Sequence, residues 1–100
     1  MQVIVELQVL PSPPGTALER WAHVEAAIAV IESSGLTYEV GPLGTSVEGE
    51  PDEVWALVRR AHEACLASGA DGLVSVIKVE QTASPSTQPT MGTLTAKFRR

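Results

Sequence analysis

Residues 35–50 read GLTYEVGPLGTSVEGE, and this stretch places two alternating segments on either side of a glycine-rich turn. In residues 36–40 (LTYEV) apolar and polar side chains alternate, and a second, more polar alternation covers residues 45–50 (TSVEGE). Residues 41–44 (GPLG) lie between them, and this composition is typical of a tight connection between antiparallel strands. The stretch therefore predicts a β-hairpin in the middle of the chain.

A helical pattern flanks the hairpin on each side. Before it, Thr16 and Glu19 form a capping-box pair, and apolar residues recur at helical spacing until Gly35 stops the helix. After it, Pro51 begins a second helix with acidic residues in its first turn, and Gly69 ends that helix. The predicted buried stripes are Leu18, Trp21, Val24, Ile28 and Ile31 in the first helix, and Val54, Leu57, Val58, Ala61 and Cys65 in the second.

Two further strands lie outside the helices. Residues 2–10 (QVIVELQVL) alternate, are rich in β-branched side chains, and place an apolar row on one face and a mostly polar row on the other. Residues 72–80 (GLVSVIKVE) form the last clear strand. Residues 81–90 (QTASPSTQPT) are rich in Ser, Thr and Pro and predict a mobile loop, and residues 91–98 (MGTLTAKF) predict one short extra C-terminal strand.

The order strand, helix, strand, strand, helix, strand predicts a single α+β domain over residues 1–100. One hundred residues provide one hydrophobic core and no second one. Because crossover connections are right-handed, both helices should cover the same face of an antiparallel sheet. The expected architecture is a ferredoxin-like βαββαβ two-layer sandwich in which the first strand lies between the last and the third.

The sheet face opposite the helices is predicted to stay uncovered. By strand alternation it carries Ile4, Glu6 and Gln8 from the first strand, Val74, Val76 and Lys78 from the last, and Ser46 and Glu48 from the third. Such a surface is too apolar for water and too charged for a dry core. Two interpretations stay open: a dimer interface with a Glu6–Lys78 ion pair, or a pocket that the same charges line where two sheets meet.

Charge and hydropathy narrow the classes of partner. The formal net charge is −5, and residues 1–90 hold four basic against all twelve acidic residues, a net −8. An acidic body repels phosphate backbones, so no nucleic-acid partner is expected. A membrane span needs about 18 consecutive apolar residues, and the chain has no such run. The N-terminus does not read as a signal peptide, so the sequence predicts a cytoplasmic protein.

Catalytic and metal-binding signals are weak. His23 and His62 fall on different helices without a ligand-type neighbour at metal-binding spacing, and both are expected to face the surface. Cys65 falls on a buried stripe, which predicts a packed thiol rather than a nucleophile. The sequence therefore predicts no catalytic residues, no metal and no cofactor, and a protein that is not an enzyme.

Several segments together resemble a known family, the small thiamine-binding proteins. They are VIVELQVLP at 3–11, GLTYEVGPLGTSVEGE at 35–50, AHEA at 61–64, SVIKVE at 75–80 and the Met91-Gly92 step. The most specific part is the pattern Pro42-x-Gly44-Thr45-x-x-Glu48-Gly49 combined with Glu6 and Lys78. The resemblance covers nearly the whole chain outside the 81–90 loop.

The resemblance implies a ferredoxin-like fold, sheet-packed dimers that often pair into tetramers, and non-catalytic binding of thiamine or its hydroxymethylpyrimidine moiety. A carboxylate on the open face would suit a cationic thiazolium joined to an aminopyrimidine, through charge and hydrogen bonding. From strand alternation, the candidate ligand-binding residues are Glu6, Gln8, Ser46, Glu48 and Lys78. The alternative is an assembly module whose sheet face serves only to hold a homodimer or homotetramer together.

Overall fold

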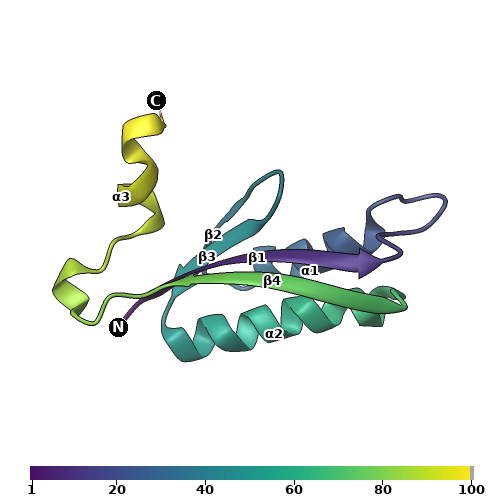
Figure 1. Ribbon diagram of the computed structural model, residues 1–100, viewed down its shortest axis with the longest axis horizontal. Helices are drawn as coiled ribbons and strands as arrows, with labels where there is room; N and C mark the ends of the chain where they lie inside the picture. Colours follow the sequence, from purple (N-terminus) through teal and green to yellow (C-terminus); the bar gives the residue numbers. More distant parts are fainter. Residues whose placement is uncertain (100) are drawn as a thin grey trace.

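A computed structural model describes residues 1–99 and confirms the α+β architecture (Figure 1). Each of the four predicted βαββαβ strands and both helices is present. Their bounds are β1 Val3–Ser12, α1 Ala22–Glu32, β2 Thr37–Val40, β3 Thr45–Gly49, α2 Pro51–Ser68 and β4 Gly72–Glu80.

The sheet is antiparallel and has the strand order β2-β3-β1-β4, with β1 between the last and the third strand as predicted. β3 pairs with β1 along Val3–Leu7, whereas β4 follows β1 from Ile4 to Ser12. One end of the sheet therefore has four strands side by side, and the end near Ser12 has only β1 and β4.

The core lies between the sheet and the two long helices, which cover the same face (Figure 1). Strand alternation places the odd-numbered residues of β1 in this core, as expected for a strand with one buried face. The predicted stripe of α2 is confirmed, because all five of its residues are buried. The central core residues of the strands and α2 are Val3, Val5, Leu7, Val47, Val54, Leu57, Val58, Ala61 and Cys65.

The predicted start of the first helix is wrong, and Ile31 is the one residue of its predicted stripe that is buried. The Glu19 N–H does donate to Thr16 Oγ1 (3.0 Å), but this bond closes a separate turn, and α1 begins only at Ala22. Leu18, in that turn, is 97% exposed. The buried face of α1 consists of His23, Ala27 and Ile31. The spacing of the large apolar residues was misleading because a histidine and an alanine occupy most of the face that packs inward.

The two histidines join secondary-structure elements. His23 is only 4% exposed, and its Nδ1 lies 2.6 Å from Ser68 Oγ at the end of α2. The prediction that His23 faces the surface is therefore wrong, since its ring packs between the two helices. His62 is partly buried, and its Nδ1 lies 2.5 Å from Ser75 Oγ in β4.

The predicted C-terminal strand is also wrong. Residues 91–98 form the short helix α3 (Met91–Thr95) and the 3₁₀ turn η2 (Ala96–Phe98), after a first 3₁₀ turn η1 (Pro85–Thr87) in the preceding loop. Thr90 and Thr93 exchange capping hydrogen bonds, with Thr93 N–H donating to Thr90 Oγ1 and Thr90 N–H donating to Thr93 Oγ1. This capping box stabilises a helix start, and it prevails over the alternation in MGTLTAKF.

Candidate functional site

The helix α3 lies on the side of the sheet opposite α2 (Figure 1). It faces only one end of the uncovered sheet face, so this face has two different halves. The first, which we call the cavity half, lies at the four-stranded end near Glu6. The second, which we call the apolar half, lies at the two-stranded end and consists of Leu10, Val74 and Val76. Charged side chains of the face gather in the cavity half.

A cavity of about 250 Å³ lies between the cavity half and the C-terminal segment. The sheet and the hairpin turn provide its floor, and α3 provides three residues of the opposite wall. Its lining combines two carboxylates, two hydroxyls, a guanidinium and apolar side chains. The lining residues are Ile4, Glu6, Glu39, Gly41, Gly44, Ser46, Met91, Leu94, Thr95 and Arg99.

Glu6 lies in the middle of this floor. It pairs across the sheet with Ser46 of β3 on one side and Lys78 of β4 on the other. Lys78 Nζ lies 3.8 Å from Glu6 Oε1, so the predicted cross-strand ion pair is present. Both side chains remain substantially exposed, and an exposed pair of this length contributes at most about 1 kcal/mol. The ion pair therefore restrains the Glu6 carboxylate only weakly, and Glu6 lines the cavity with a side chain that can still accept hydrogen bonds.

The hairpin turn approaches Glu6 closely at Gly44. A Cβ atom at this position would lie 3.2 Å from Glu6 Cγ and 3.2 Å from the Leu7 carbonyl oxygen. Gly41 N–H donates to the Gly44 carbonyl (2.8 Å), which closes the turn. The glycine therefore allows the turn to pack directly on the Glu6 side chain.

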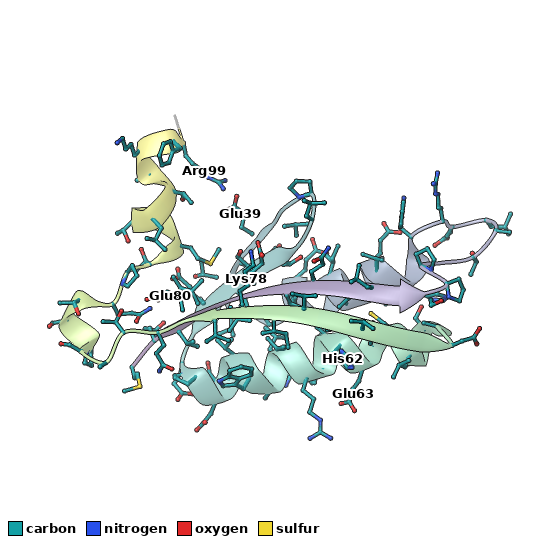
Figure 2. All side chains as sticks on the ribbon, viewed as in Figure 1. Glu39, His62, Glu63, Lys78, Glu80 and Arg99 are labelled. Carbon is teal, nitrogen blue, oxygen red and sulfur yellow. The ribbon has the colours of Figure 1, made fainter. Side chains whose placement is uncertain are left out.

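The other carboxylates of this face hold the C-terminal segment. Glu48 Oε2 accepts the Met91 N–H (3.0 Å), at the start of α3. Glu80 Oε1 accepts a hydrogen bond from Gln88 Nε2 (2.6 Å), before α3. Farther along, Arg99 forms an ion pair with Glu39. Figure 2 shows the Arg99 and Glu39 side chains pointing toward each other from the C-terminal segment and the hairpin.

The structure brings together most, but not all, of the predicted site residues. Glu6 and Ser46 line the cavity, Glu48 bonds to Met91 in its wall, and Lys78 forms an ion pair with Glu6. Gln8 lies away from this cavity and borders a different one.

Sequence reasoning missed the residues that complete the cavity. Glu39 could have been predicted, because the register of the predicted hairpin places it opposite Ser46. Arg99 and the α3 residues were not, because residues 91–98 were expected to form a strand.

A wider cavity of about 490 Å³ lies on the helix side, between α1 and the hairpin turn. Its lining is mostly apolar, with half-exposed Trp21 and strongly exposed Leu43 among its residues, and Glu25 is its one charged lining residue. It shares Gly41 and Gly44 with the smaller cavity, so the hairpin turn borders both. The polar groups that would orient a ligand are concentrated in the smaller cavity.

Other reactive groups are unsuited to chemistry at this site. Burial raises the pKa of the Cys65 thiol, which keeps it protonated and unreactive inside the core. Within residues 1–99, no three His, Cys, Asp or Glu side chains come together in a way that could hold a metal ion. In the same part of the chain, no helix combines the length and the apolar character needed to cross a bilayer.

The fold and this site define a ferredoxin-like α+β protein with a polar cavity on its uncovered sheet face. The sequence matches the family described as thiamine-binding protein over residues 5–97, and the chain belongs to this family.

The chain is similar to one relative in sequence and to two solved structures in fold. A UPF0045 protein of Clostridium perfringens is 37% identical over 76 residues, which is 76% of this chain and 78% of that protein. A domain of unknown function, DUF77, from Bacillus cereus has a TM-score of 0.85 at 34% identity, covering 99% of this chain and 91% of that one. A proposed thiamine biosynthesis or salvage protein of Thermotoga maritima has a TM-score of 0.82 at 26% identity, covering 99% and 100%.

Proposed function

We propose that this protein binds thiamine or its hydroxymethylpyrimidine moiety in the cavity between the sheet and α3, and that it does not transform the ligand. The observation that carries the proposal is the Glu6 carboxylate, which lines a cavity that also contains Ser46. Membership of the thiamine-binding family and similarity to a proposed thiamine biosynthesis or salvage protein support it.

The ligand's chemistry complements these groups. An aminopyrimidine offers an amine that donates hydrogen bonds and ring nitrogens that accept them, while thiazolium carries a positive charge. Glu6 can accept from the amine, and the Ser46 hydroxyl can donate to a ring nitrogen. A volume of about 250 Å³ is slightly below the usual range for small-molecule pockets, about 300–1,000 Å³, and suits one ring better than two. We place the pyrimidine inside and the thiazolium toward the rim.

The experiment is calorimetric titration of the protein with thiamine and with hydroxymethylpyrimidine. Glu6→Gln should weaken binding by about 1.5–3 kcal/mol, the contribution of a charge-assisted hydrogen bond, which is roughly ten- to a hundredfold in affinity. Lys78→Met is the matched control, since it removes the ion pair and should spare most of any direct contact between Glu6 and the ligand. Unchanged thiamine binding in Glu6→Gln would remove Glu6 from the site.

A second candidate function, homo-oligomerisation, is favoured by the apolar half. Leu10, Val74 and Val76 are all exposed on a two-stranded section of sheet, and contiguous exposed apolar side chains usually mark an interface. We propose that this half packs against a second copy of the chain to give a dimer, which could pair again into a tetramer. Sedimentation at micromolar concentration that showed only a 10.6 kDa species would contradict this assignment.

A further inference from the structure

We propose that residues 81–99, called the strap below, close the cavity like a lid, and that the Arg99–Glu39 ion pair is its latch. This inference rests on the proposed function for its effect on ligand exchange, but the strap itself can be tested without any ligand.

The strap is fastened to acidic side chains of the sheet at three places. Gln88 donates to Glu80 where the strap begins, and the Met91 N–H donates to Glu48 at the start of α3. The third fastening, Arg99 to Glu39, lies beyond α3 on the hairpin side. The strap carries Lys97 and Arg99, whereas residues 1–90 have a net charge of −8, so long-range attraction also favours the closed position.

Apolar packing holds the strap only lightly. Met91 is buried, but Leu94 is 54% exposed and Phe98 is 77% exposed. Lifting the strap therefore exposes little additional apolar area, and the three polar contacts determine the population of the open state. Because Leu94, Thr95 and Arg99 are all part of the cavity lining, lifting the strap opens the cavity.

The latch is the fastening that a single substitution removes most cleanly. Arg99 and Glu39 are partly exposed, and exposed ion pairs are weak, so loss of the latch should raise the open population about two- to fivefold. A ligand beneath the strap must wait for the same opening to enter or leave. Latch loss should therefore speed association and dissociation together and change affinity much less than it changes the rates.

The first test is amide hydrogen exchange without ligand. The Met91 amide donates to Glu48 of the sheet, so this bond breaks when the strap lifts, and the amide should exchange about two- to fivefold faster in Arg99→Met and in Glu39→Gln. Lys97→Met is the matched control, because it removes the same charge without removing the latch. Core amides of β1 should be unaffected and report that the fold is intact. Equal exchange in wild type and Arg99→Met, or equal acceleration by Lys97→Met, would overturn the latch.

The second test measures thiamine release by surface plasmon resonance. Dissociation should be about two- to fivefold faster in Arg99→Met than in wild type or Lys97→Met. If wild type does not bind thiamine but the exchange result holds, the proposed function fails and the strap stands. If thiamine binds and latch loss changes neither exchange nor release, the strap fails and the proposed function stands.

Discussion

The two halves of the uncovered sheet face share β1 and β4 but differ in their neighbours. In the cavity half, four strands lie side by side and the strap lies above them, so Glu6 has charged neighbours on the sheet and a wall of α3 residues facing it. The apolar half lies beyond the reach of β3, which pairs with β1 only as far as Leu7, and Val74 there is 62% exposed. Alternation along a strand selects which residues reach a face, whereas the neighbouring elements determine what that face can do.

This division changes the relation between the two interpretations of the open face. From the sequence, a ligand pocket and a subunit interface compete for one mixed surface. In the structure, the charges and the exposed aliphatic side chains lie at opposite ends of the same strands. Under the proposals above, ligand binding belongs to the cavity half and self-association to the apolar half, so each can be disrupted without the other.

The largest effect is expected from Val76→Asp in the apolar half. If Val76 is buried between two copies, an aspartate there places an unpaired charge in the interface, which costs about 3–5 kcal/mol. The dimer dissociation constant should rise more than about a hundredfold, as measured by sedimentation. Thiamine binding to the cavity half should change much less.

Leu18→Asp provides the control for this variant. It adds the same charge at an apolar residue that is almost fully exposed and lies far from β4 in the sequence and outside the sheet. Assembly should be unaffected. A dimer that survives Val76→Asp, or that is lost equally in Leu18→Asp, would show that the apolar half is not the interface.

A smaller effect is expected from Gly44→Ala in the cavity half. The new methyl group would lie too close to the Glu6 side chain and to the Leu7 carbonyl. Both neighbours would have to shift by a few tenths of an ångström. We expect about 1 kcal/mol less stability, the low end for an overpacked site, and about tenfold weaker thiamine binding by calorimetry. Gly72→Ala is the matched control, because a methyl group there meets nothing within 4 Å. Equally strong thiamine binding in both variants would show that the hairpin turn is not part of the binding site.

How far the sequence predicts this fold can be judged from its helices. The α2 stripe was predicted in full because its five buried residues are apolar and regularly spaced. The α1 stripe was mostly missed because His23 is satisfied by Ser68, a contact between residues 45 positions apart that no local pattern contains. The α3 helix was missed because its capping box uses threonine in place of the usual glutamate at the fourth position.

The candidate site was predictable wherever strand register alone determines it. Glu6, Ser46 and Lys78 follow from the β1 alternation and the antiparallel pairing, and they lie where that reasoning puts them. The latch could not be found, because the pairing of Arg99 with Glu39 depends on the path of the C-terminal segment. Gln8 has the correct alternation but lies one row too far along β1 to reach the cavity.

The smallest effect is expected in the loop that connects β4 to the strap. Replacing residues 83–87 with glycine and serine removes the exposed η1 turn but keeps Gln88 and its bond to Glu80. The side chains of this loop are exposed, so the free energy of unfolding should change by less than about 0.5 kcal/mol, and Tm by less than about 4 °C. A thermal scan that showed a much larger drop would mean that the loop, and not only the strap's fastenings, stabilises the fold.

Binding in the cavity half is tested most directly by an NMR titration of the ¹⁵N-labelled protein with thiamine, which reports on both halves and on the wider cavity at once. If thiamine binds in the cavity half, the largest amide shifts will occur at Glu6, Ser46 and Leu94. Shifts that concentrated at Val74, or at Trp21 beside the wider cavity, with Glu6 unaffected, would contradict it.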